Sequence, residues 1–249
     1  EYEYKAGDPN VPEIPKITPG ESQPDSERVS SVVYPGGILA VHSQGRGKEA
    51  IWTALKNKNV YGTSGPKILL WFDLLNSPEG KVPMGSKITM SQNPRFIVRA
   101  AGSFKQNEGC AHESIDSLSA ERLEYLCAGE CYNPTNEREI IEKIEVVKIT
   151  PQNYEGEAIS PLIQDPWKTI QCPMEGKCIA EFEDQNFSRD SVYYVRAIQK
   201  PTLAINGSPL SQRENFELCK GSFRTDLEDN CLSMTGERAW SSPIYVDKP

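Results

Sequence analysis

The stretch VYGTSGPKILLWF, residues 60–72, decides between two folds. Its two glycines, two hydroxyl residues and lysine are typical components of a phosphate-binding loop. Such a loop, however, needs a lysine directly after its second glycine and then a helix whose N-terminal amides face the phosphate. Here Gly65 is followed by Pro66, which has no amide hydrogen, and then by an apolar, strand-like run. The stretch therefore excludes a P-loop nucleotide enzyme and predicts a junction that leads into β structure.

A small α/β unit is predicted upstream of this junction. Two glycines followed by ILAV at residues 38–41 indicate a short buried strand, and residues 47–59 carry apolar residues at helical spacing. Val60 and Tyr61 then resume an extended conformation. This order predicts a βαβ-like unit over residues 33–66, which needs partners outside this sequence to close a sheet or a barrel.

The chain from residue 67 to its end has the composition of β structure. Six segments rich in β-branched and aromatic residues are separated by Pro, Gly and Asn: 68–75, 96–101, 144–150, 178–182, 192–198 and 239–246. These segments predict an antiparallel β-sandwich over residues 67–249. One short surface helix is predicted near residues 119–128, where Leu123 and Leu126 share one helical face.

The composition excludes two classes of partner. The 249 residues include 35 acidic and 27 basic residues, a net charge of −8, and the basic residues are scattered among the acids. Nucleic-acid binding needs clustered Lys and Arg, so we expect no nucleic-acid partner. No apolar run approaches the roughly 18–20 residues that span a bilayer, so we expect no membrane span. Residues 1–32, rich in proline and acids, are predicted to form an extended surface loop.

Seven cysteines in the second part of the chain predict disulfide-closed loops: Cys110, Cys127, Cys131, Cys172, Cys178, Cys219 and Cys231. Their C-x3-C, C-x5-C and C-x11-C spacings match neither zinc-ribbon nor zinc-finger patterns. Disulfides are favoured over a metal cluster or reduced thiols, and they predict a periplasmic or secreted protein. The odd count leaves one thiol over, and the isolated Cys110 is the candidate for a free or intermolecular thiol.

The two histidines do not form a known catalytic motif. His42 and His112 stand apart, and the sequence lacks H-x-H, H-E-x-x-H, D-x-H and G-x-S-x-G motifs. The sequence therefore predicts no self-contained hydrolytic metal site. His42, which directly follows the strand at residues 38–41, is a better candidate for lining a site than His112, which is expected in a polar loop.

Seven blocks of sequence, in this order, carry a family resemblance: PGGILAV, KEAIWTALKNKNVYGTSGPKI, VPMGS, ERLEYLCAGECYNPTNE, IEVVKI, YYVRAIQ and ERAWSSPIYV. They resemble the C-terminal part of a bacterial family known as domain of unknown function 3604 (DUF3604). That family is similar to the PHP (polymerase and histidinol phosphatase) superfamily of metal-dependent hydrolases. The resemblance covers residues 33–246.

The resemblance implies that the chain is the C-terminal part of an exported hydrolase. Residues 33–66 would form the last elements of a PHP-like α/β barrel, and residues 67–249 an appended β-sandwich. The N-terminal PHP-like barrel portion would hold a divalent metal, Zn, Mn or Fe, and metal-bound hydroxide would attack a small-molecule phosphoester or related ester. None of the family's metal-ligand motifs falls on this chain, so the chain alone is expected to be inactive.

The resemblance also suggests where this chain would meet the active site. In α/β barrels the active site lies at the C-terminal ends of the strands. By this argument Thr63, Ser64 and His42, each following a predicted strand, are candidates for contacting substrate or groups around the metals. The alternative is that GTSGP only shapes the junction between barrel and sandwich.

A competing hypothesis is a non-catalytic module that binds glycans or a partner protein, or that is purely structural. Four aromatic residues distinguish these functions: Trp71, Trp167, Tyr193 and Trp240. An exposed row of them would favour glycan binding, whereas their burial would favour a structural core.

Overall fold

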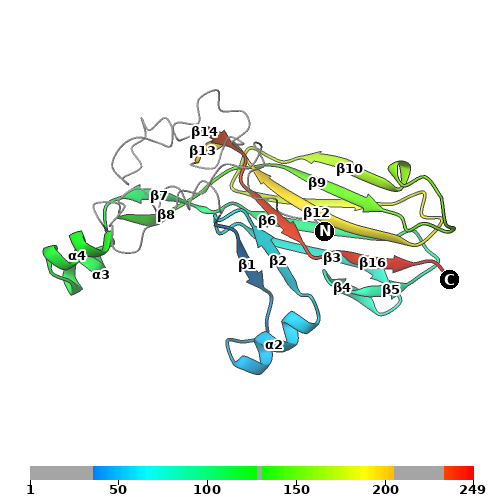
Figure 1. The fold of residues 1–249 in the computed structure, drawn as a ribbon, viewed down its shortest axis with the longest axis horizontal. Helices are drawn as coiled ribbons and strands as arrows, with labels where there is room; N and C mark the ends of the chain where they lie inside the picture. Colours follow the sequence, from blue (N-terminus) through cyan, green and yellow to red (C-terminus); the bar gives the residue numbers. More distant parts are fainter. Residues whose placement is uncertain (1–35, 128–130, 205–232) are drawn as a thin grey trace, which may run out of the picture.

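The computed structural model describes residues 36–127, 131–204 and 233–249 (Figure 1). Two packed β-sheets make up most of the described chain, and a two-stranded arm that carries two short helices extends from them. The loop predicted at residues 1–32 lies outside the described residues.

The larger sheet has eight strands arranged around one central strand. They are β1 (Ile38–Val41), β2 (Val60–Thr63), β5 (Lys87–Thr89), β9 (Ile141–Ile149), β10 (Ile163–Gln171), β12 (Ser191–Gln199), β15 (Arg238–Ser241) and β16 (Ile244–Asp247). On one side, β12 pairs with β9, which pairs with β10. On the other side, β12 pairs with β16 in its first half and with β15 in its second half. β15 leads on to β2 and β1, and β16 leads on to β5.

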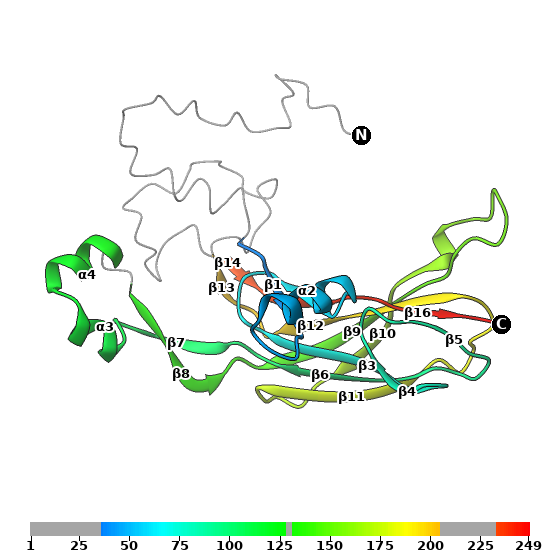
Figure 2. The ribbon, with the colours of Figure 1, turned by 90° about the horizontal axis from the view of Figure 1, so that it is seen from below.

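The smaller sheet packs face to face against the larger one, and Figure 2 shows the two layers. Its order is β11 (Lys177–Glu183), β6 (Arg95–Ala101), β3 (Leu69–Ser77) and β4 (Gly80–Pro83). Among the described strands, every pair is antiparallel except β16 with β5. The predicted antiparallel sandwich is therefore confirmed, with one parallel pair. Outside the two sheets lie the short pair β13 (Thr202–Ala204) and β14 (Ser233–Thr235) and a 3-10 helix (Ser160–Leu162).

The hydrophobic core lies between the two sheets. Alternation along β3 turns Leu70, Phe72 and Leu74 inward, and all three are fully buried. Across the interface, Phe96 of β6 and Tyr193 of β12 pack with ring centroids 4.8 Å apart. Burying a side chain of this size contributes about 1.5–3 kcal/mol, so the inward rows of both sheets hold the sandwich together.

The strand–helix–strand unit differs from its prediction. β1 and β2 are antiparallel neighbours, with Ile38 opposite Thr63, whereas a βαβ unit has parallel strands. A parallel crossover needs a helix that packs on a sheet face. The helix α2 (Lys48–Lys56) has one buried side chain, Ala54, and stands away from the sheets (Figure 1). The predicted βαβ-like arrangement is therefore wrong, although its helix and both strands form where expected.

β1 and β2 are also continuous with the sandwich. β2 pairs with β15 in the larger sheet, so the hairpin extends that sheet by two strands. The strand at residues 38–41 was expected to be buried because all four residues are apolar. Instead, Ile38 and Leu39 are exposed on β1, which is the outermost strand of the larger sheet.

The arm consists of β7 (Phe104–Glu108) and β8 (Tyr132–Arg138), with α3 (His112–Ser117) and α4 (Ala120–Cys127) at its tip (Figure 1). The helix predicted near residues 119–128 is confirmed as α4. α3 is not expected from the sequence, because its six residues are too few to show apolar periodicity. It places His112 at the start of a helix rather than in a polar loop.

A disulfide between Cys110 and Cys131 closes the excursion that contains α3 and α4, with 4.8 Å between the two Cα atoms. The predicted free or intermolecular thiol at Cys110 is therefore wrong. The pairing of β7 with β8 sets Glu108 opposite Tyr132 and so brings the two cysteines together across 21 residues of sequence. Sequence spacing gives no sign of this pairing, because the contact depends on the strands.

The second disulfide is short-range. Cys172 and Cys178 are bonded and six residues apart, which confirms the C-x5-C loop expected from the sequence. Among the other predicted disulfide residues, Cys219, Cys231 and the side chain of Cys127 lie outside what the structure describes.

A buried polar group joins the two sheets. Asp184, which directly follows β11, accepts hydrogen bonds from Lys148 Nζ of β9 and from Tyr193 OH of β12, both at 2.5 Å. All three residues are buried. Burial raises the pKa of the Asp184 carboxyl, but the hydrogen bonds from Lys148 and Tyr193 outweigh it and lower this pKa below its ordinary value. Asp184 is therefore the counter-ion that allows Lys148 to be buried.

We expect Asp184→Asn to destabilise the sandwich by about 3–5 kcal/mol, because the substitution leaves the Lys148 ammonium buried without its counter-ion. Urea unfolding at neutral pH measures this loss.

The lowered native pKa of Asp184 also means that the stability from this ion pair is present above the ordinary carboxyl pKa of 3.8 and is lost as the pH falls through the native pKa. The variant lacks this acid-induced loss. The exposed Asp116→Asn is the matched control and should change stability by less than about 0.5 kcal/mol. A loss below about 1 kcal/mol in Asp184→Asn would contradict the assignment.

Candidate docking surface

Thr63 and Ser64, two of the three predicted site residues, lie where β2 joins β15. The Thr63 side chain is buried, and its Oγ1 accepts a hydrogen bond from the Gly65 amide at 3.2 Å. Ser64 Oγ donates to the Glu237 carboxylate and accepts from the Arg238 amide at 2.9 Å. Both hydroxyls are thus engaged within the chain, as the junction alternative expects.

His42, the third predicted site residue, fastens the end of β1 to the smaller sheet. Its Nε2 donates to the Leu70 carbonyl oxygen of β3 at 2.8 Å. Its ring lies between Tyr61 and Trp71, with centroid distances of 5.3 and 5.7 Å. These contacts give His42 a packing role.

The structure does not bring the three residues together. Thr63 is opposite Ile38 at one end of the hairpin, and the His42 amide bonds to the Asn59 carbonyl oxygen at the other end. Four residues of strand separate the two positions by about 13 Å. A shared face at the strand ends would require parallel strands, so the antiparallel pairing removes the geometric reason for grouping His42 with Thr63 and Ser64.

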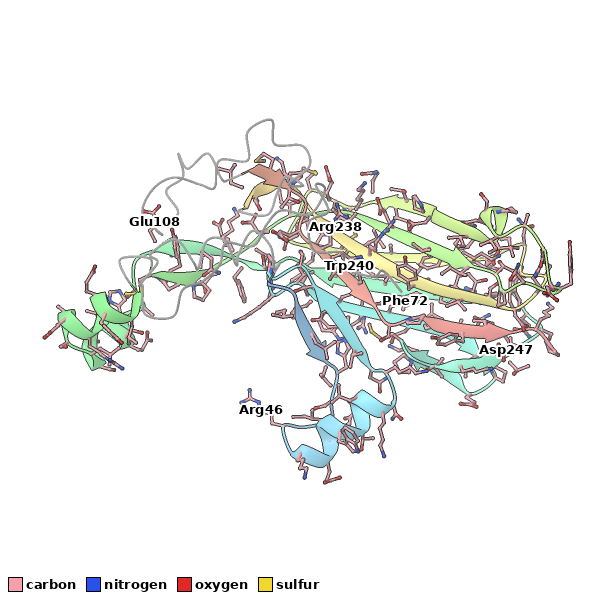
Figure 3. All side chains as sticks on the ribbon, in the orientation of Figure 1. Arg46, Phe72, Glu108, Arg238, Trp240 and Asp247 are labelled. Atoms are coloured by element: carbon pink, nitrogen blue, oxygen red, sulfur yellow. A yellow bond between two sulfur atoms is a disulfide. The ribbon has the colours of Figure 1, made fainter. Side chains whose placement is uncertain are left out.

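A metal site and a glycan-binding row of aromatic residues are two further kinds of site to compare with the described residues. Within the described ranges, no three His, Cys, Asp or Glu side chains are grouped so as to hold a metal ion. Of the four aromatic residues that would mark a glycan platform, Tyr193 is fully buried, and Trp71, Trp167 and Trp240 are half-buried. Figure 3 shows Trp240 and Phe72 within the body of the sandwich. This burial favours a structural core over a glycan-binding row.

The exposed apolar residues of α2 are the feature that the sequence prediction missed. Ala54 is the buried side chain of α2, whereas Trp52 is 54% exposed and Ile51 and Leu55 are each exposed by just over a third. A surface helix normally turns its large apolar residues toward its own core and its small or polar residues outward. α2 has the opposite orientation, so its large apolar face is available to another body.

The ends of α2 follow ordinary helix rules, so its orientation is not a consequence of poor local structure. Glu49 in the first turn and Lys56 in the last turn have the signs that the helix dipole favours. Lys58, with a φ of 57°, turns the chain out of the helix and into β2. The short turn on each side fixes the helix next to β1.

β1 also carries exposed apolar residues, near its N-terminal end. Ile38 is half-exposed and Leu39 is 60% exposed. We call these two residues together with Ile51, Trp52 and Leu55 the β1–α2 surface. Ile38 and Leu39 are neighbours on a strand and point to opposite faces of the sheet, so the exposed apolar side chains lie around the outermost strand as well as on the helix.

Basic residues surround the α2 part of this surface. Residues 45–59 contain four basic residues and one acid, a net charge of +3 in a chain of net charge −8. The Lys56 ammonium lies 5.4 Å from the centre of the Trp52 ring. Arg46 precedes the helix and is labelled in Figure 3. The α2 part of the surface therefore combines exposed apolar side chains with a local excess of positive charge.

Comparison with protein families places this surface inside a recognised unit. Residues 7–108 match the model of a family described as "Protein of unknown function (DUF3604)". The match is to DUF3604. It supports the resemblance found in the sequence, although it begins earlier and ends much earlier than the seven blocks suggest. It includes β1, α2 and β2 and ends at the last residue of β7. No curated protein and no solved structure matches the chain.

If the β1–α2 surface serves a partner rather than the fold, substitutions there should leave the isolated chain stable. We expect Trp52→Ser and Leu55→Ser each to change the free energy of unfolding by less than about 0.5 kcal/mol. The matched core substitution, Leu74→Ala, removes fully buried methyl groups and should cost about 2–5 kcal/mol. Urea unfolding of the chain separates the two cases. A loss above about 1.5 kcal/mol in either α2 variant would show that the fold itself depends on this surface.

Proposed function

We propose that this chain is the non-catalytic β-sandwich part of an exported PHP-like metal-dependent hydrolase, and that it docks on the metal-holding part through the β1–α2 surface. The observation that carries the proposal is the outward orientation of the large apolar residues of α2. A helix of this kind gains little stability from its own chain, and it gains more when a second folded body covers it.

The size of the surface suits a contact between domains. Five large apolar side chains are between one third and two thirds exposed. Covering each of them adds about 1 kcal/mol, so their sum is about 5 kcal/mol before the costs of ordering and desolvation. Within a single polypeptide much of the entropy cost of association is already met, so a contact of this strength suffices to hold two domains together.

The chemistry of the proposed hydrolase would come from the part that this chain docks on. A divalent metal there, Zn, Mn or Fe, would supply a hydroxide that attacks a small-molecule phosphoester or related ester. This chain would position that part and bury one side of it. Thr63, Ser64 and His42, which already bond within the chain, would keep β1, β2 and the sandwich in register.

Two observations are compatible with an exported protein. The two disulfides are of a kind that persists in the periplasm or outside the cell. No helix in the described part of the chain is long and apolar enough to cross a membrane. We therefore include export in the proposal.

A protein-binding module is the second candidate, and the arm favours it. Three apolar or aromatic residues near the tip of the arm, Ile115, Tyr125 and Leu126, are each at least half-exposed. The disulfide of Cys110 holds the base of this tip closed. A module that binds through the arm would need no hydrolase.

The decisive test of the hydrolase compares the protein made from its complete gene with the 249-residue chain. Both are assayed with p-nitrophenyl phosphate and bis(p-nitrophenyl) phosphate in the presence of Zn²⁺, Mn²⁺ or Fe²⁺. We expect metal-dependent hydrolysis by the complete protein and none by the chain alone. Hydrolysis by the chain alone, or none by the complete protein with any metal, would refute the proposal.

The junction role of Ser64 makes a separate prediction. Ser64→Ala removes the hydrogen bonds to Glu237 and Arg238, and we expect it to lower the stability of the chain by about 1 kcal/mol. In the complete protein it should leave kcat/KM within about twofold, because the hydroxyl is not placed to touch substrate. A drop of about 100-fold or more, equivalent to about 2.7 kcal/mol in the transition state, would instead restore the substrate-contact hypothesis.

A further inference from the structure

We propose that β1 is the point at which the larger sheet continues into the docked partner. An edge strand of that partner pairs with the open edge of β1, and an apolar surface rimmed with acidic residues covers α2. The identity of the partner, the upstream part of the same protein, rests on the function proposed above. The mode of docking rests on the backbone and charges described below.

The open edge of β1 can be assigned residue by residue. The His42 amide bonds to the Asn59 carbonyl oxygen at 2.8 Å, so hydrogen-bonded pairs recur at every second residue before it. Ala40 and Ile38 therefore point their peptide groups toward β2. The peptide groups of Leu39 and Val41 point away from β2, and no other described strand pairs with them.

The other outer strands of both sheets carry features that discourage pairing, and β1 carries none. β10 contains Pro166 and an irregular register, and β4 ends at Pro83. β11 is lined with charges such as Lys177 and Glu181, and β5 is only three residues long. Natural edge strands use such features to prevent unwanted pairing. β1, with the sequence ILAV, has no proline, charge or bulge.

A second copy of this chain fits the open edge poorly. Two β1 strands related by a two-fold axis would pair antiparallel, which puts their α2 helices at opposite ends of the paired strands. Each α2 face would then stay uncovered. The region next to β1 in a second copy would also be basic, because residues 45–59 carry a net charge of +3, so it would not complement the charge of α2. A different folded unit can offer both a free edge strand for β1 and, beside that strand, an apolar surface bordered by acidic residues for α2.

The first test is amide hydrogen exchange at β1 in the 249-residue chain and in the protein made from its complete gene. In the chain alone, Leu39 and Val41 should exchange fast, and Ala40 should be protected by β2. In the complete protein, we expect Leu39 and Val41 to exchange at least tenfold more slowly. If they exchange equally fast in both samples, the proposal is overturned.

The second test separates strand pairing from side-chain contact. Leu39→Pro removes the open-edge amide and leaves the ladder with β2 intact, whereas Leu39→Ala removes only the side chain. In the complete protein, Leu39→Pro should return Val41 to fast exchange, and Leu39→Ala should keep most of its protection. Equal effects of the two substitutions would refute strand pairing.

A third test reverses the charge of two lysines on α2 and so asks whether the partner surface is acidic. The double substitution Lys48→Glu and Lys56→Glu should lower the protection of Val41 in the complete protein at least fivefold, and high salt should do the same to the unsubstituted protein. Glu79→Lys, a single exposed charge reversal far from α2 in sequence, is the control. No effect of the double reversal would refute the acidic rim. Metal-dependent hydrolysis is measured on the same samples, so the failure of the docking mode and the failure of the hydrolase are separate outcomes.

Discussion

The hydrogen-bonded ladder along β12 is the constraint on which the rest of the described structure depends. This strand pairs with β9 along one edge, and its other edge accommodates β16 and then β15. Tyr193, near its start, also packs on Phe96 and bonds to Asp184, so the same strand ties the two sheets together. Every other strand of the larger sheet is connected to β12 by strand pairing, directly or through one or two neighbours.

The position of the β1–α2 surface follows from that ladder. β15 shares the edge of β12 with β16, and β2 joins the sheet beside β15. β1 is then the outermost strand, and α2 has no sheet face beneath it on which to bury Trp52. The chain thus keeps a well-formed helix whose large apolar residues remain partly exposed.

The sequence predicts the parts of this structure that depend on local pattern. β-branched and aromatic runs indicate β3, β6, β9 and β12, and helical spacing indicates α2 and α4. It does not predict which way an element faces. The spacing of Ile51 and Leu55 shows that they share a face, but the same spacing fits a face turned inward or outward. The buried position of Ala54, next to these two on the helix, is not distinguished by the sequence.

Long-range pairing explains the remaining differences. The link between Cys110 and Cys131 depends on the register of β7 and β8, and β1 pairs with β2 across a connection that contains α2. For the same reason, Thr63, Ser64 and His42 were grouped by a barrel geometry that the hairpin does not have. The candidate site in the structure is therefore the apolar β1–α2 surface and not these three polar residues. Sequence motifs for catalytic or metal-binding residues do not identify an apolar surface.

The central claim is that the β1–α2 surface is covered in the complete protein. Hydroxyl-radical footprinting of the Trp52 side chain, read by mass spectrometry, tests it most directly, with the 249-residue chain as the reference. We expect oxidation of Trp52 to fall several-fold in the complete protein, while oxidation of the exposed Tyr154 stays unchanged. Equal oxidation of Trp52 in the two samples would contradict it.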